Sequence, residues 1–333
     1  MAPASRDTSH LDEDDVRIRP SRGTRPRSKQ RPGHVDATAG MVVTVDRGRY
    51  TVLVGEAEVT AMRARELGRR PIAVGDRVDV VGDRSGAVDT LARIVRISER
   101  STVLRRTADD TDDTERVIVA NADQLVIVAS LTAPEPRYGL IDRCLVAALS
   151  AGLEPVLCLT KADLVESAEP VLARYYPLSV PAIVLRRDGD LTKIRERLTG
   201  QMSVLVGHSG VGKSTLINAL IPEAHRRTAV VSAIGKGRHT STSAIALRLP
   251  GGGWAIDTPG VRSFGLAHVS TADLLWAFPD LEDGTNLCPP GCEHLCATAG
   301  CRLDAWVAAG NAGIERLEAF RRLLASRGTA GEP

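Results

Sequence analysis

Short segments of alternating apolar and polar residues fill the first part of the chain, from Ala39 to about Arg106. Gly and Asp turns separate these segments, which read MVVTVDRGRYTVLV, AEVTAM, DRVDVVG and ARIVRI. Such alternation is typical of strands that bury one face, so the pattern predicts a small β-barrel. About seventy residues in about five strands match the size of an OB-fold, a barrel that often binds oligonucleotides.

The barrel segment contains one aromatic residue, Tyr50. It therefore lacks the aromatic platforms on which single-strand readers stack successive bases. Its arginines can instead hold folded RNA through phosphates and shape, or form a solvated surface that Asp and Glu balance. These arginines are Arg63, Arg65, Arg69, Arg70, Arg93, Arg96, Arg100, Arg105 and Arg106.

After the acidic linker ADDTDDTE, the pattern changes to continuous apolar runs that alternate with helical stretches. The runs are QLVIVAS, PVLCLT, PAIVL and SVLVG, and the helical stretches include IDRCLVAAL and LTKIRERL. Strands without a polar face are buried on both sides, so this part of the sequence predicts a parallel sheet of βα units.

A glycine-rich loop follows the last of these runs. SVLVGHSGVGKSTLINAL fits a strand, a loop and a helix, and its loop matches G-x-x-x-x-G-K-S. Loop N–H groups and the helix N-terminus would bind phosphates, Lys213 would span the β- and γ-phosphates, and the Ser214 hydroxyl would ligate Mg²⁺. The expected nucleotide contacts are Gly207, His208, Ser209, Gly210, Val211, Gly212, Lys213, Ser214 and Thr215, with no role for the His208 side chain.

Two later segments predict the rest of a phosphate site. The strand GGGWAID ends at Asp257, whose carboxylate would reach Mg²⁺ through water, and the N–H of Gly260 would meet the γ-phosphate. In the preceding segment GKGRHTSTSAIALRL, we expect one hydroxyl among Thr240, Ser241 and Thr242, with Thr240 as first choice, to close over Mg²⁺ when the γ-phosphate is present. Val261 cannot orient water, so His239 is our candidate to position the nucleophile, unless it is only an exposed loop residue.

The turn after PVLCLT carries candidate base-reading residues, Thr160, Lys161 and Asp163. A carboxylate at Asp163 can accept from guanine N1–H and the exocyclic amine, whereas adenine offers an acceptor at N1. Lys161 would lay its aliphatic stem along the base. The sequence therefore favours GTP over ATP, which argues against an ATPase or a kinase.

Cysteines cluster near the C-terminus in a spacing typical of metal sites. Cys288, Cys292, His294 and Cys301 offer three thiolates and one imidazole, a complete tetrahedral set for one structural Zn²⁺, and Cys296 is a further candidate ligand. The helical stretch GIERLEAFRRLLASR follows; we predict a packing helix, with Arg321, Arg322 and Arg327 as candidate phosphate contacts.

The order of these motifs is unusual, because Asp163 precedes Lys213, whereas ordinary GTPases place the phosphate loop first. We interpret the α/β domain as a circularly permuted P-loop GTPase. GHSGVGKSTLIN, GRHTST, DTPGVRSFGL, ANADQLVIV and the Cys/His cluster together closely resemble the RsgA (YjeQ) family, over residues 39 to 325.

The resemblance implies a GTPase that binds the 30S subunit and its 16S rRNA late in assembly, hydrolyses GTP slowly and is stimulated by the subunit. GCRLDAWVAAG matches the family's run after its last metal ligand, which favours Cys301 over Cys296. Two departures stand out. The family motif has Asn where this chain has Thr160, and VLRRDGDL lacks the family's Ser-Ala pair, so guanine contacts there would come from backbone N–H groups. Thr160 and Val261 keep open an RNA-binding assembly scaffold with a structural nucleotide.

Composition and charge narrow the remaining classes. The chain has 333 residues, of which 43% are hydrophobic and 25% charged, and no apolar run long enough to span a bilayer. No secretory signal opens it, so we expect a cytoplasmic protein with no membrane partner, and a monomer. The net charge of +2 conceals the segment Arg17–Arg31, which has seven basic residues and no acid, and which is either a solubility tail or an RNA contact. We thus expect a disordered tail at 1–38, an OB-fold at 39–107, the GTPase domain at 108–282 and a zinc-binding helical module at 283–333.

Overall fold

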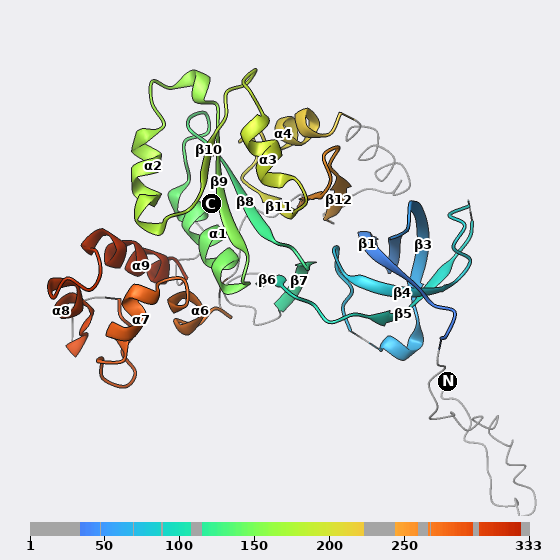
Figure 1. Cartoon of the computed structure of the whole chain (residues 1–333), viewed down its shortest axis with the longest axis horizontal. Coiled ribbons are helices and arrows are strands. Elements are labelled where there is room, and N and C mark those ends of the chain that lie inside the picture. The colour runs from blue at the N-terminus through green and yellow to red at the C-terminus, as the bar shows by residue number, and fades with distance from the viewer. Residues whose placement is uncertain are drawn as a thin grey trace, which may run out of the picture. The chain divides into compact units, whose positions relative to one another are not determined.

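The computed structural model describes residues 34–46, 48–68, 70–87, 89–107, 115–222, 244–258, 266, 268–295 and 300–327 (Figure 1). Contacts divide the chain into residues 1–35 and 36–333, and all elements below belong to the second unit. Residues 1–33 of the predicted tail, residues 108–114 of the acidic linker and the loop that holds His239 and Thr240 lie outside the described residues. Among the helices that are described, none combines the length and the apolar composition needed to cross a membrane.

The first five strands form a closed barrel, as the alternating pattern predicted. They are β1 (Thr38–Asp46), β2 (Arg49–Val54), β3 (Ala57–Arg63), β4 (Arg77–Gly82) and β5 (Ala92–Ile97), with the short helix η2 (Arg65–Leu67) after β3. Their order is β1-β2-β3-β5-β4, and β4 pairs back with β1, which closes the barrel. One apolar face of each strand points inward, and Val42, Val52, Val59, Val80 and Ile94 are fully buried there.

The predicted parallel sheet is also present. In spatial order it contains β10 (Ala182–Val184), β9 (Glu154–Thr160), β8 (Gln124–Ser130), β11 (Met202–Val206), β13 (Trp254–Asp257) and β12 (Ile245–Arg248). Neighbouring strands run parallel except for the pair β12 and β13.

Helices cover both faces of this sheet, which explains its continuous apolar runs. On one face Leu125 and Ile127 share a core with α1 (Tyr138–Ser150) and α2 (Glu169–Tyr175). On the other face Val126 and Val128 pack with α3 (Thr192–Leu198) and α4 (Lys213–Leu220). The turns η3 (Ala162–Leu164) and η4 (Tyr176–Leu178) connect these elements.

The barrel and the parallel sheet are joined in two places. Strand β1 pairs with β12 at Thr44 and Ile245, which makes one continuous sheet. The second join is the chain that leads from the barrel into the parallel sheet, which forms the hairpin of β6 (Val103–Thr107) and β7 (Glu115–Ala120).

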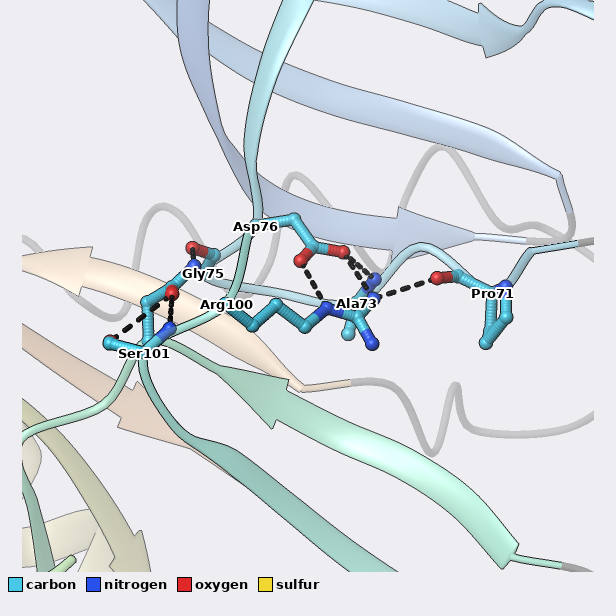
Figure 2. A network of polar contacts seen from close by, with 7 residues as sticks. Pro71, Ala73, Gly75, Asp76, Arg100 and Ser101 are labelled. Carbon is cyan, nitrogen blue, oxygen red and sulfur yellow. Dashed lines mark hydrogen bonds and ion pairs between the residues drawn. The ribbon is translucent and has the colours of Figure 1, made fainter. Parts of the chain in front are cut away.

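A buried polar network stiffens the second join (Figure 2). The fully buried carboxylate of Asp76 accepts from Arg100 Nε at 2.7 Å and from the Ala73 N–H at 2.8 Å. Beside it, the Asn121 amide donates to the Gly75 carbonyl at 2.9 Å and accepts from the Ser101 N–H at 2.9 Å. Because Asn121 follows β7, this amide ties the barrel loop to the chain that enters β8.

The C-terminal part contains α6 (Ala272–Leu275), α7 (Pro279–Thr285), α8 (Leu303–Ala308) and α9 (Ile314–Ser326). Helix α9 packs its apolar face into the core that includes α1, and the rings of Phe278 and Phe320 lie 5.0 Å apart. This confirms the predicted packing helix.

The three arginines proposed as phosphate contacts on α9 bind within the protein instead. Arg321 pairs with Asp304 at 2.7 Å, Arg322 pairs with Asp142 at 3.2 Å, and Arg327 donates to the Val269 carbonyl at 2.9 Å. Carboxylates and carbonyls brought close by tertiary packing therefore use these donors, and the sequence could not show that proximity.

Candidate functional site

The glycine-rich loop connects β11, which ends at Val206, to α4, which begins at Lys213. Gly212 has a φ of +96° and Gly210 a φ of +83°, a region that favours glycine. A Cβ at Gly207 would lie 2.4 Å from the Val128 carbonyl oxygen, so only glycine fits against β8 there. The loop can thus follow the tight path that is typical of phosphate-binding loops.

Of the expected phosphate and magnesium residues, the described ones, Lys213, Ser214 and Asp257, lie at the carboxyl ends of β11 and β13. The Lys213 ammonium forms an ion pair with the Asp257 carboxylate, and both side chains are mostly buried. Ser214 and Thr215 are exposed on the first turn of α4. A carboxylate and a hydroxyl are the oxygen ligands that Mg²⁺ prefers, so the residues present fit this ion.

The base-reading turn lies beside the same loop. The Thr160 hydroxyl donates to the Val211 carbonyl at 2.5 Å, and the Lys161 ammonium donates to the Gly210 carbonyl at 2.9 Å. The Lys161 ammonium also contacts the Ala133 carbonyl. Thr160 therefore supplies a tie between the base-reading turn and the phosphate loop, although it is a hydroxyl where the family motif has an amide.

A pocket of about 390 Å³ opens next to this turn, within the usual range for small-molecule sites. Its wall comes from the base-reading turn, the segment after β10, Gly212 of the phosphate loop and α4. The lining residues are Thr160, Lys161, Asp163, Leu164, Leu185, Arg186, Arg187, Leu191, Gly212, Thr215, Leu216 and Ala219.

Asp163 lies at the exposed edge of this pocket. Its Oδ1 accepts a 2.9 Å hydrogen bond from the backbone N–H of Arg187. This hydrogen bond is the main reason that the pKa of Asp163 lies below its usual value, and the nearby Arg186 and Arg187 charges act in the same direction. The carboxylate is therefore ionised at neutral pH, the state that accepts guanine N–H groups.

Three expected nucleotide residues, His239, Thr240 and Gly260, lie outside the described residues, as does Val261. The His208 ring faces its own loop, with Nδ1 2.8 Å from the Ser209 carbonyl oxygen. Sequence reasoning placed no specific residue after β10, where Leu185 and Arg187 line the pocket. The sequence led us to expect backbone N–H donors from this segment, and the Arg187 N–H is such a donor, although it contacts the Asp163 carboxylate.

A second cluster brings together Cys288, Cys292, His294 and Cys301, and their ligand atoms all lie within 4.8 Å of one another. Tetrahedral zinc with Zn–S bonds of about 2.3 Å places its ligand atoms about 3.8 Å apart. Cys301 Sγ lies 3.9 Å from His294 Nδ1, which fits that spacing. The cluster can hold a metal ion, and it contains Cys301 as expected, while Cys296 lies outside the described residues.

The surroundings of this cluster also suit a metal. The N–H of Arg302 donates to Cys288 Sγ at 3.2 Å, and Arg321 lies 3.9 Å from Cys301 Sγ, so positive groups face the sulfur atoms. Burial and the Arg321 charge lower the pKa of His294, which favours the neutral imidazole that binds metals. Such contacts to the ligands orient them and stabilise thiolates.

Comparisons with known proteins agree with this geometry. A family model described as RsgA GTPase matches residues 97–267. A small ribosomal subunit biogenesis GTPase RsgA from Pseudomonas savastanoi is 38% identical over 282 residues, which cover 82% of this chain and 80% of that protein. The protein of the same name from Ectopseudomonas mendocina is 42% identical over 218 residues, or 63% of each chain.

A solved structure shares the fold as well. The crystal structure of YjeQ from Thermotoga maritima matches with a TM-score of 0.62 and 25% identity. The match covers 88% of this chain and 99% of that one. It therefore includes the barrel, the parallel sheet and the C-terminal helices together.

Proposed function

The chain belongs to the RsgA GTPase family, and from this premise we propose that it hydrolyses GTP to GDP and phosphate while it assists late assembly of the 30S ribosomal subunit, which stimulates the reaction. The observation that carries the proposal is a direct contact between the two segments expected to bind the base and the phosphates. The phosphate loop and the base-reading turn meet through the contact between Thr160 and Val211. One nucleotide can therefore occupy both sites at once.

Guanine recognition is assigned to Asp163, the carboxylate that the Arg187 N–H holds at the pocket edge. The ionised carboxylate accepts two N–H groups from guanine and repels the N1 acceptor of adenine. Lys161 holds the turn on the loop through the Gly210 carbonyl, and its aliphatic stem lines the base pocket.

Phosphate binding and catalysis are assigned to the loop Gly207–Thr215 and its lysine. The N–H groups of Ser209, Gly210, Val211, Gly212 and Lys213 and the N-terminus of α4 hold the phosphates. Lys213 leaves Asp257 for the β- and γ-phosphate oxygens, where its charge stabilises the negative charge that develops during phosphoryl transfer. Bound Mg²⁺, held by Ser214, Asp257 and Thr240, supplies further charge stabilisation when present.

Hydrolysis without the ribosome is expected to be slow, since Val261 cannot orient water. We assign Gly260 to the γ-phosphate and His239 to the attacking water in the ribosome-bound state. These two assignments rest on sequence order, because both residues lie outside the described part of the chain.

The metal in the cysteine cluster is proposed to be one structural Zn²⁺. Three thiolates and an imidazole fill a tetrahedral shell and leave no open position for a substrate. The ion would hold the segment between α7 and α8, which has few apolar residues of its own.

Contact with 16S rRNA is proposed for the barrel and the basic tail. On the outer barrel face the register places Met62 opposite both Arg49 on β2 and Arg93 on β5. All three side chains are exposed, so two cations share this face and can contact phosphates. We propose that the protein acts as a monomer in the cytoplasm, the compartment in which small subunits assemble.

The test is steady-state hydrolysis of GTP with and without purified 30S subunits. The proposal expects multiple turnovers that rise in proportion to added subunits, and no comparable turnover of ATP. Subunit binding with no turnover would instead support the RNA-binding scaffold. An equal response to ATP would contradict the assignment of Asp163.

A further inference from the structure

The base pocket lacks the Ser-Ala pair that usually accompanies a guanine-reading carboxylate in this family, since Leu185, Arg186 and Arg187 follow β10. A side-chain hydroxyl that could orient the Asp163 carboxylate is therefore missing from this segment. The structure instead places a backbone donor there, because the Arg187 N–H lies 2.9 Å from Asp163 Oδ1.

The backbone around this donor is tightly held. Leu185 donates to the Leu159 carbonyl at 2.7 Å, and its own carbonyl accepts from the Ala162 N–H at 3.1 Å. After Arg187 the chain turns at once, with a bond of 3.2 Å from Gly189 to the Arg186 carbonyl. The bonds of Leu185 hold the segment against the base-reading turn before Arg187, and the local bond from Gly189 to Arg186 fixes the turn that contains Arg187.

The start of α3 anchors the other end of the segment. Asp190 Oδ1 accepts from the N–H of Thr192 at 2.8 Å and from its hydroxyl at 2.6 Å. The peptide N–H of Arg187 is therefore a preorganised donor rather than a group on a free loop. A donor in a fixed position costs little ordering entropy when a ligand binds.

On this basis, and resting on the proposed GTP site, we propose that Arg187 is the positioning residue for guanine specificity and that it acts through its backbone N–H, which orients the Asp163 carboxylate toward the base. The bond to Oδ1 sets the plane of the carboxylate and leaves Oδ2 and the second lone pair of Oδ1 for the guanine N–H groups. The lowered pKa of Asp163 has the same origin and agrees with this role. The guanidinium of Arg187 is not needed for it.

The test compares Arg187→Pro, which removes the N–H, with Arg187→Ala, which keeps it. Affinities for GTP, ATP and inorganic tripolyphosphate are measured by calorimetry. A hydrogen bond to a charged group contributes enough that we expect roughly tenfold or greater weakening of GTP in the proline variant. ATP and tripolyphosphate should change by no more than about twofold, and the alanine variant should keep the wild-type ratio of GTP to ATP affinity.

A second pair of measurements separates positioning from general damage to the fold. In an Asp163→Ala background, Arg187→Pro should cause no further loss of GTP affinity, because the group that it positions is gone. An α-hydroxy acid at position 187 replaces the amide by an ester, which removes the N–H, keeps the side chain and weakens the Arg186 carbonyl as an acceptor. This variant should reproduce the proline result.

Different failures point to different errors. If the ester variant keeps the wild-type preference for GTP, or if the proline effect persists in the Asp163→Ala background, the role of Arg187 is wrong while the GTP site stands. If the wild-type protein shows no preference for GTP over ATP, the proposed function itself fails.

Discussion

The Thr160 hydroxyl lies 2.5 Å from the carbonyl oxygen of Val211, and this contact joins the base-reading turn to the phosphate loop. Both groups are buried, so the loss of the donor would leave a carbonyl without its partner. We expect Thr160→Val to weaken GTP binding roughly fivefold to tenfold, the usual effect of one buried hydrogen bond. Fluorescent-nucleotide titration measures it, and Thr160→Ser, which keeps a hydroxyl, is the matched control. Equal affinities for the valine and serine variants would show that the contact is not used in the bound state.

Lys213 and Asp257 form an ion pair that a bound nucleotide must replace. Asp257→Asn removes one charge from the expected magnesium ligands, so the Mg²⁺ concentration for half-maximal GTP hydrolysis should rise roughly tenfold. The affinity for GDP in the absence of Mg²⁺ should stay the same or increase, because the Lys213 ammonium is no longer paired with a carboxylate. Asp123→Asn is the control, since Asp123 binds the Met202 N–H at the opposite end of β11. An unchanged magnesium dependence would remove Asp257 from the ion's ligands.

The cysteine cluster predicts about one zinc per chain, held most strongly when all four ligands are present. Cys301→Ser should lower the zinc content measured by mass spectrometry and lower the melting temperature. Cys144→Ala is the control. Cys144 is a buried thiol, and its burial raises its pKa to about 12. Its loss should leave the zinc content unchanged. Full zinc content in the Cys301→Ser protein would indicate that Cys296 takes the fourth position.

Gly75 marks the join between the barrel and the parallel sheet (Figure 2). It has a φ of +88°, and a Cβ there would lie 2.0 Å from the Ala120 carbonyl oxygen. Gly75→Ala should therefore reduce the free energy of unfolding by about 2 kcal/mol or more, as judged by urea denaturation. Gly55 has a φ of +60° with no atom near its Cβ position, so Gly55→Ala should cost only about 1 kcal/mol. Equal losses in the two variants would mean that the join relaxes around the new methyl group.

Asp163 also predicts how nucleotide preference depends on pH. Its pKa lies below the usual value, mainly because of the Arg187 N–H, so the ionised form is present above that pKa and is lost as the pH falls through it. The ratio of GTP to ATP affinity should therefore stay constant from pH 8 to about pH 5, since an ordinary Asp titrates near about 3.9. A fall in this ratio with a midpoint above pH 5 would indicate a raised pKa and would contradict the hydrogen-bonded geometry.

Much of the architecture could be predicted from local sequence patterns. The segments ARIVRI and QLVIVAS coincide with β5 and β8, because alternation and continuous apolar runs record how many faces of a strand are buried. The glycines of the phosphate loop and the Cys/His spacing could also be recognised in the sequence, because phosphate binding and metal binding each require particular residue types at short intervals. The contacts that Arg321, Arg322 and Arg327 make within the protein could not be predicted, because a sequence shows charges but not their partners.

The sequence alone thus determined most of the strands, though not the hairpin of β6 and β7, as well as the Cys/His cluster and the permuted order of the GTPase motifs, because these properties depend on residue type and spacing. Only the tertiary structure decided that β1 joins β12, that Thr160 holds Val211 and that the Arg187 N–H orients Asp163. Those relationships connect residues distant in sequence, and all three use backbone groups, which nearly every residue carries. Their specificity comes from position in space, which the folded chain alone sets.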